Sequence, residues 1–346
     1  MLYQTKNPHG GDIYGEEVEL DFSANTNPFG TPQGIIDAVR TALPEMHRYP
    51  DPYCRKLTQA ISDFEEVSRE YILCGNGAAD LIYAYCEAVR PKLAVELAPT
   101  FSEYALGLER VGSRVERYYL RQENEFELGE GFLPYLTETK PDAVFLCNPN
   151  NPTGKIIDAK LMKQILALCK QNGACLFVDE CFLDLSDSGE SLKQYLVNYR
   201  NLFILKAFTK SYGMAGIRLG YCMSSDSELL EKMSQSTQPW NVSSIAQAAG
   251  IAALQEQAFL QKTKDLIVVE RQWLKERLEE LGFRVFQSSA NYLLFHGPAD
   301  LHIKLKEKKI SIRNCDNYYG LGPGWYRIAV RLYEENIRLI QAIKEV

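Results

Sequence analysis

Short apolar runs alternate with helical patterns along the chain from about residue 70 onward. Seven of these runs have the length and composition of buried strands. The segments between most of them keep apolar residues at helical spacing, as in residues 80–90 and 159–173, and the second ends in Asn172-Gly173, a typical helix stop. The strand candidates are "YILCG", "LAVELA", "RVERYYL", "DAVFLC", "ACLFVDE", "NLFIL" and "IRLGYCM". This alternation predicts an α/β fold with a mostly parallel, seven-stranded sheet flanked by helices on both faces.

The last third of the chain has a different pattern. A long helical region follows "QPWNVSS", and its last part stops at Gly282. Its apolar residues near helical spacing are Leu266, Val269, Trp273, Leu278 and Leu281. Four short strand patterns and a final helix come next: "FRVF", "NYLLF", "KISIR", "YRIAV" and "EENIRLIQAIKEV". The sequence therefore predicts a second, smaller α+β domain.

Residues 1–35 are rich in Gly, Pro and Asn, which indicates an irregular arm that lies over other structure. We therefore expect four parts along the chain. They are an arm that joins the small domain (1–45), a large α/β domain (46–238), a linking helix (239–265) and the small C-terminal domain (266–346).

Composition and charge exclude several function classes. The chain has 346 residues, 46% of them hydrophobic and 24% charged, with a net charge of −7 and no basic run, which disfavours a nucleic-acid partner. No stretch approaches the roughly 20 apolar residues of a membrane span, and the first 15 residues lack the apolar core of a secretory signal. The nine cysteines are scattered singly without a C-x-x-C pair, which disfavours zinc and predicts a reduced, cytoplasmic protein.

Unusual residues follow four of the predicted strands, at the sheet edge where open α/β folds bind ligands. "GNGAAD" is a glycine-rich turn before a helix, which can seat a phosphate on free backbone N–H groups. "NPNNPTGK" is an irregular loop with inward-pointing amides, and its spacing does not match a P-loop. Asp179 ends a buried strand, and Lys210 and Arg218 come after the next one. Each feature alone fits a plain turn or a structural ion pair as well as a binding site.

Pyridoxal 5′-phosphate is the one explanation that covers all these features together. Its phosphate needs backbone N–H groups, a hydroxyl and an arginine, its ring nitrogen needs a carboxylate, and its aldehyde needs a lysine amine. The sequence therefore predicts that Lys210 carries this cofactor.

The motifs "GNGAAD", "NPNNPTGK", "VDECF" and "FTKSYGMAGIRLGY", in this order, resemble those of the fold-type I pyridoxal phosphate enzymes of the aminotransferase class I/II family. The resemblance covers nearly the whole chain. Two branches compete, histidinol-phosphate aminotransferase and the L-threonine-O-3-phosphate decarboxylase of cobalamin synthesis, and "RYPDP" resembles both. "PHGGDIY", "LDFSANTNPFG" and "SIRNCDNYYGLGPGWYRIAVR" resemble the decarboxylase branch. The family resemblance also implies a homodimer with shared active sites.

The resemblance assigns roles around the cofactor. Lys210 matches the lysine that forms the Schiff base, and Asp179 matches the carboxylate that pairs with the pyridinium nitrogen. Phe101 matches the aromatic residue that stacks on the ring, and Asn151 the amide that binds its phenolic oxygen. The cofactor phosphate would be held by Gly77, Ala78, Thr209 and Arg218, and by Tyr49 from the partner subunit.

Substrate contacts follow from the same resemblance. Arg327 matches the carboxylate-binding arginine, whose fork suits two-point recognition, and Arg313 matches an arginine that reads the substrate phosphate. His9, Asn25 and Asn151 would assist. Arg331 is a further candidate, although its position fits a surface arginine equally well.

Three positions depart from the family patterns. Ala207 and Ala79 stand where a hydroxyl residue is usual, so one or two phosphate hydrogen bonds are missing, at roughly 0.5–1.5 kcal/mol each. Phe182 replaces the tyrosine of the aminotransferase branch, and the decarboxylase branch has Phe there too.

The leading expectation is decarboxylation of L-threonine O-3-phosphate to (R)-1-amino-2-propanol O-2-phosphate and CO2. The alternative is transamination of histidinol phosphate with 2-oxoglutarate. Serine phosphate stays open as a substrate, because a pocket discriminates one methyl group by only about 1–3 kcal/mol. A third reading, a cofactor-binding regulator without turnover, is disfavoured because the catalytic-type architecture uses the whole sequence.

Overall fold

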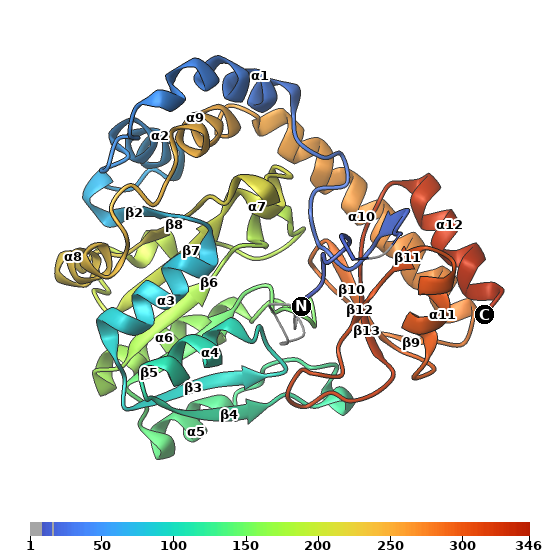
Figure 1. Cartoon of the computed structure of the whole chain (residues 1–346). Coiled ribbons are helices and arrows are strands. Elements are labelled where there is room, and N and C mark those ends of the chain that lie inside the picture. Colours follow the sequence, from blue (N-terminus) through green and yellow to red (C-terminus); the bar gives the residue numbers. More distant parts are fainter. Residues whose placement is uncertain (1–8, 16) are drawn as a thin grey trace.

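The computed structural model describes residues 9–15 and 17–346, and its largest feature is one seven-stranded sheet (Figure 1). The strand order is β2-β8-β7-β6-β5-β3-β4, and only β8 runs antiparallel to its neighbours. The strands are β2 (Ile72–Gly75), β3 (Leu93–Ala98), β4 (Arg114–Tyr119), β5 (Ala143–Cys147), β6 (Cys175–Asp179), β7 (Leu202–Ala207) and β8 (Gly220–Met223). The predicted α/β fold with a mostly parallel sheet is confirmed.

Helices cover both faces of this sheet because successive strand residues point to opposite sides. In β5, Val144 and Leu146 belong to one buried cluster, whereas Phe145 and Cys147 belong to the other. The first face is covered by α2 (Arg55–Glu65), α5 (Phe132–Thr139) and α6 (Ala159–Asn172), and the second by α3 (Ala78–Val89), α4 (Glu103–Arg110) and α8 (Ser227–Ser236).

The predicted strand "IRLGYCM" begins three residues later than expected, at Gly220. Ile217 ends a short 3-10 turn, and Arg218 has a left-handed backbone with φ of 59°. The turn is needed because the backbone of Gly220 passes close to the glycine turn before α3, where a Cβ would lie 2.8 Å from the amide nitrogen of Ala78. Arg218 therefore precedes the strand rather than opening it.

The C-terminal part has its own sheet, with the strand order β12-β13-β10-β9. A separate parallel pair joins β1 to β11, so a segment near the N-terminus is built into the C-terminal part (Figure 1). The predicted short strands and the final helix are present. The elements are β1 (Leu20–Asp21), β9 (Arg284–Val285), β10 (Tyr292–His296), α11 (Leu301–Glu307), β11 (Ile310–Ser311), β12 (Arg313–Asn314), β13 (Trp325–Ala329) and α12 (Tyr333–Lys344).

Three further helices connect the two sheets: α1 (Gln33–Ala42), α9 (Ser244–Ala253) and α10 (Gln257–Glu280). Helix α10 passes without a break through residues 265 and 266, where we expected a domain boundary, and the division into domains stays a prediction. Residues 1–8 and 16 of the expected arm lie outside the described residues.

The predicted apolar face of α10 is partly wrong, because the side chain of Val269 is 65% exposed. Glu270 and Arg271 are buried on that helix instead. Both find polar partners: Glu270 accepts a hydrogen bond from Asn336, and Arg271 pairs with Asp187. Paired charges can therefore occupy helix positions that a hydrophobic pattern assigns to solvent.

Two features are absent from the residues that the structure describes. No helix there is long and apolar enough to cross a bilayer, and no group of His, Cys, Asp and Glu residues could hold a metal ion. All nine cysteines are free thiols, and each is buried except the half-buried Cys175.

Candidate active site

A cavity of about 220 Å³ lies where β5, β6 and β7 end, and it is completed by residues of the C-terminal sheet. It gathers side chains that are up to about 300 positions apart in the sequence. All but three of the predicted site residues are among them. The predicted site residues that line it are His9, Asn25, Ala78, Phe101, Asn151, Asp179, Thr209, Lys210, Arg218, Arg313 and Arg327.

Lys210 lies in the short helix α7 (Phe208–Ser211), directly after β7. Burial, chiefly, and the nearby guanidinium of Arg327 together lower the pKa of Lys210 to about 8. A lysine amine whose pKa approaches neutrality is a better nucleophile, because more of it is uncharged. The geometry therefore gives Lys210 the character of an amine that can attack an aldehyde.

Asp179 ends β6 and is buried in the same cavity. Its Oδ1 accepts a hydrogen bond from the backbone N–H of Cys181 at 2.8 Å, and its Oδ2 accepts one from the hydroxyl of Tyr104 at 2.5 Å. Burial raises the pKa of Asp179, while these donors act in the opposite direction. A carboxylate in this position can pair with a protonated ring nitrogen.

A cradle for a phosphate lies at the first turn of α3. Gly77 has φ of +85° at the residue before this helix, whose first N–H groups have no partner within the helix. A Cβ on Gly77 would lie 2.8 Å from Nη2 of Arg218. Thr209 and Ala78 line the cavity beside this turn. Backbone donors, a hydroxyl and a guanidinium thus meet at one end of the cavity.

Two arginines face each other on neighbouring strands. Arg313 on β12 and Arg327 on β13 are directly opposite in the antiparallel register. Arg327 donates from Nη1 to Oδ1 of Asn151 and from Nη2 to the carbonyl oxygen of Ser23, at 2.8 Å. Both arginines line the cavity, so one site presents two guanidinium groups to a ligand.

Several buried polar atoms in the cavity have no hydrogen-bond partner among the described residues. They are Nε of Arg327 and both amide atoms of Asn25, a residue only 1% exposed. Buried polar groups normally have a partner. These atoms therefore indicate a site shaped for a polar ligand.

Apolar side chains form the walls between the charged ends. Phe101 packs against His9 with ring centroids 5.7 Å apart, and the imidazole Nε2 of His9 lies 2.7 Å from Oε1 of Glu103. Nζ of Lys210 lies 5.7 Å from the ring centroid of Phe182. Flat apolar walls, a phosphate cradle, a carboxylate and a lysine together fit pyridoxal phosphate.

Three predicted site residues do not line this cavity. Gly77 is adjacent to it through its contact with Arg218. Tyr49 is 78% exposed and stacks on Trp240 with ring centroids 4.5 Å apart. Arg331 pairs with Glu335 at 3.0 Å, in the first turn of α12. The structure thus separates Arg331 from the other two arginines.

Sequence reasoning missed Ser23, Tyr104 and Tyr318. Ser23 and Tyr318 line the cavity, and the hydroxyl of Tyr318 lies 3.4 Å from Oδ1 of Asn151. Ser23 and Tyr318 belong to the motifs "LDFSANTNPFG" and "SIRNCDNYYGLGPGWYRIAVR", and Tyr104 lies in "PTFSEY", three positions after Phe101. Their presence in those motifs was the available signal.

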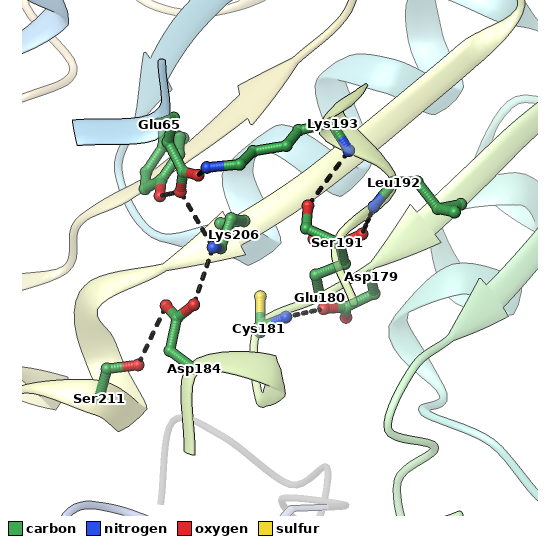
Figure 2. A network of polar contacts seen from close by, with 11 residues as sticks. Glu65, Asp179, Glu180, Cys181, Asp184, Ser191, Leu192, Lys193, Lys206 and Ser211 are labelled. Atoms are coloured by element: carbon green, nitrogen blue, oxygen red, sulfur yellow. Dashed lines mark hydrogen bonds and ion pairs between the residues drawn. The ribbon is translucent and has the colours of Figure 1, made fainter. Parts of the chain in front are cut away.

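A buried ionic network lies behind the site, and Lys206 is its centre (Figure 2). Nζ of Lys206 lies 2.9 Å from Oε1 of Glu65 and 2.8 Å from Oδ1 of Asp184, and Lys193 lies 2.9 Å from Oε2 of Glu65. Ser211, next to Lys210, donates weakly to Asp184 at 3.5 Å. The network therefore connects the segment after Asp179 with the turn that carries the lysine.

The charges of this network balance in the interior. Burial opposes ionisation of Glu65, but Lys206, Tyr221 and Lys193 lower its pKa to about 2. Burial likewise opposes the charge on Lys206, and the carboxylates of Asp184 and Glu65 nevertheless raise its pKa well above the usual value. Both groups are thus ionised at neutral pH.

Comparisons with known proteins identify the family of this chain. The family model described as "Aminotransferase class I and II" matches residues 17–343. The chain is 34% identical to the threonine-phosphate decarboxylase of Salmonella typhimurium, over 98% of this chain and 96% of that protein. It is 27% identical to the histidinol-phosphate aminotransferase of Methanococcus aeolicus, over 97% of this chain and 91% of that protein.

A solved structure has the same fold. The histidinol-phosphate aminotransferase of Clostridium acetobutylicum superposes with a TM-score of 0.88 and 28% identity, covering 94% of this chain and 98% of that one. The match of the family model covers most of the chain, as do these relatives. The chain therefore belongs to the aminotransferase class I and II family and is an enzyme that depends on pyridoxal 5′-phosphate.

Proposed function

We propose that this enzyme decarboxylates L-threonine O-3-phosphate to (R)-1-amino-2-propanol O-2-phosphate and CO2, as a step of cobalamin biosynthesis. The observation that carries the proposal is the pair formed by Arg313 and Arg327, which lie opposite each other in one cavity. An arginine fork binds a carboxylate or a phosphate at two points. Threonine phosphate carries both anions in a single molecule.

Each residue has a distinct task in this proposal. When bound, pyridoxal phosphate supplies an aldehyde that reacts with amines and a ring that accepts the electron pair of a breaking Cα bond. Lys210 provides the amine that holds the cofactor, and later gives way to the amine of the substrate. Asp179 keeps the ring nitrogen protonated. Gly77, Ala78, Thr209 and Arg218 hold the cofactor phosphate.

The arginines decide which bond breaks. Arg327 orients the substrate carboxylate, and Arg313 holds the substrate phosphate with help from His9 and Asn25. Arg327 would hold the substrate carboxylate in the orientation in which the bound cofactor could accept the electrons of the Cα–carboxylate bond, and CO2 would then be released. If the arginines instead presented the Cα–H bond for cleavage, the amine of Lys210 could move that proton, and the reaction would be a transamination.

Transamination of histidinol phosphate with 2-oxoglutarate is the second candidate, favoured by the histidinol-phosphate aminotransferases among the relatives. That substrate has a phosphate but no carboxylate, so the two arginines would serve two different molecules in turn. The decarboxylase is supported more strongly by the higher identity of its relative, 34% against 27–30% for the histidinol-phosphate aminotransferases.

We also propose that the enzyme is a homodimer in which the partner's Tyr49 reaches the cofactor phosphate. Tyr49 does not line the cavity of its own chain, and its ring is 78% exposed. Trp240, which stacks on it, is 45% exposed, so the two rings form an aromatic patch. Such a patch suits contact with a second copy.

The decisive experiment is incubation of the purified enzyme with pyridoxal phosphate and L-threonine O-3-phosphate, without any 2-oxo acid. We expect stoichiometric CO2 and an amino-alcohol phosphate. Absence of CO2, with histidinol phosphate consumed only after addition of 2-oxoglutarate, would establish the transaminase instead. O-Phospho-L-serine in the same assay measures how strongly the substrate methyl group is selected.

Replacement of Lys210 tests whether the protein catalyses either of the two proposed reactions or only binds the cofactor without turnover. We expect Lys210→Ala to lower turnover by about 10²–10⁴-fold and to abolish the absorbance of the lysine-bound cofactor. Lys155→Ala is a suitable control, because Lys155 pairs with Glu127 outside the cavity. Turnover of Lys210→Ala near the wild-type rate would refute the proposed role of this lysine.

A further inference from the structure

We propose that Tyr104 is a positioning residue that keeps the Asp179 carboxylate ionised, so that the ring nitrogen of the bound cofactor retains its proton. This inference rests on the proposed role of Asp179. Tyr104 lies on α4, is fully buried, and does not itself line the cavity. It therefore acts on the cofactor only through the carboxylate.

The two hydrogen bonds that Asp179 accepts leave one side of its carboxylate free to contact a ligand in the cavity. The Tyr104 hydroxyl donates to Oδ2 at 2.5 Å, and the backbone N–H of Cys181 donates to Oδ1 at 2.8 Å. Each carboxylate oxygen can accept more than one hydrogen bond. Asp179 also lines the cavity, so a lone pair can face a ligand there.

Asp179 has no cation at ion-pair distance among the described residues, in contrast to Glu65 behind the site. The titratable groups near it include the thiols of Cys147 and Cys181, the hydroxyls of Tyr104 and Tyr292, and the amine of Lys210. Burial raises the pKa of Asp179, and the donors from Cys181 and Tyr104 oppose that rise. A neutral hydroxyl thus takes the place of a counter-charge.

The hydrogen bond from Tyr104 determines whether one proton resides on the ring nitrogen of the cofactor or on the Asp179 carboxylate. A hydrogen bond to a carboxylate stabilises its charged form. With the Tyr104 donor present, the shared proton stays on the ring nitrogen and Asp179 is an anion. Without it, the proton moves from the ring nitrogen to Oδ of Asp179, which leaves a neutral ring and a neutral acid. A neutral ring accepts electrons less well.

The chain contains a matched control for this hydroxyl. Tyr85 is also fully buried, and both tyrosine rings pack against Phe145 and Phe177. The hydroxyl of Tyr85 lies near the cysteine side chains of residues 86, 169 and 175 and not at a carboxylate. Tyr85→Phe therefore removes a buried hydroxyl from the same aromatic cluster without touching Asp179.

The experiment is nitrogen-15 NMR of ring-labelled pyridoxal phosphate bound to the intact enzyme, because the chemical shift of this nitrogen reports its protonation directly. We expect wild type and Tyr85→Phe to give the same protonated-ring signal, and Tyr104→Phe to move it toward the unprotonated pyridine. We also expect Tyr104→Phe to weaken cofactor binding about tenfold. An unchanged signal in Tyr104→Phe would overturn the proposal.

Asp179→Asn separates the two levels of inference. If it shifts the nitrogen signal and Tyr104→Phe does not, only the role of Tyr104 fails. If the signal in Asp179→Asn equals that of wild type, the proposed role of Asp179 fails, and the inference about Tyr104 fails with it. Melting temperatures of the three variants show whether each is folded.

Discussion

Arg327, on a strand of the C-terminal sheet, donates a hydrogen bond to Oδ1 of Asn151, which follows β5 of the large sheet and is 176 positions away in the sequence. The same guanidinium reaches the backbone of Ser23 in the N-terminal segment. One side chain thus fixes three distant segments around the cavity. A change at Arg327 should alter ligand binding and the shape of the site together.

We expect Arg327→Lys to raise KM for the phosphorylated substrate about 10–100-fold, because lysine keeps the charge but loses two-point binding. Steady-state kinetics with the substrate identified by the CO2 assay measures this. Arg331→Lys is the matched control: it lies four positions further on, pairs with Glu335 and does not line the cavity. If Arg331→Lys raised KM as much as Arg327→Lys, Arg331 would also belong to the substrate site.

Gly77→Ala should weaken cofactor binding about tenfold or more, because the new Cβ would press on the guanidinium of Arg218 and the left-handed backbone is strained by about 1–3 kcal/mol. The dissociation constant follows from an absorbance titration with pyridoxal phosphate. Gly112→Ala also places a side chain at a positive φ, +79°, but its Cβ would meet nothing within 4 Å. Equal effects of the two variants would show that strain alone explains the loss.

Capture of the cofactor by the apoenzyme should depend on pH through Lys210. Its pKa of about 8 lies below that of an ordinary lysine, so roughly one tenth of the amine is uncharged at pH 7. The rate of capture should rise about tenfold per pH unit up to pH 7 and level off above pH 8. Stopped-flow absorbance from pH 6 to 10 measures it. A rate that kept rising to pH 10 would indicate an unperturbed amine.

Glu65→Gln should lower the free energy of unfolding by about 3–5 kcal/mol, because it leaves the buried Lys206 short of a counter-charge. Urea denaturation at pH 7 measures this, and Glu45→Gln is the control, since its pair with Arg48 is mostly exposed.

The pH dependence of that loss is a further check. Glu65 has a folded pKa of about 2, lower than its ordinary value of 4.5. Its contribution to stability is therefore fully present above pH 4.5 and is lost as the pH falls toward 2. The difference in the free energy of unfolding between wild type and Glu65→Gln should therefore shrink as the pH falls from 4.5 toward 2. A difference in the free energy of unfolding that stayed constant would mean that Glu65 acts through its shape rather than its charge.

The sequence predicted the large sheet well because its strands, apart from the partly exposed edge strand β4, are mostly buried and appear as apolar runs. The same pattern could not locate the turn at Arg218, because a close approach to Gly77 and Ala78 sets it. Lys210 and Asp179 were found through their place after strands. The sequence did not reveal that Tyr104 donates a hydrogen bond to Asp179, because Tyr104 lies in a helix and reaches the carboxylate only through tertiary packing. The sequence left the role of Arg331 open. In the structure Arg331 pairs with Glu335, four positions further on, and does not line the cavity.

The pairing of β1 with β11 has a consequence for the growing chain. Residues 20 and 21 have their strand partners at 310 and 311, which the ribosome adds almost three hundred residues later. All strands of the large sheet have been made by residue 223, and that part can begin to fold during synthesis. The N-terminal segment must wait for its partners, so the cavity that Arg327 completes forms only after residue 327 has been made.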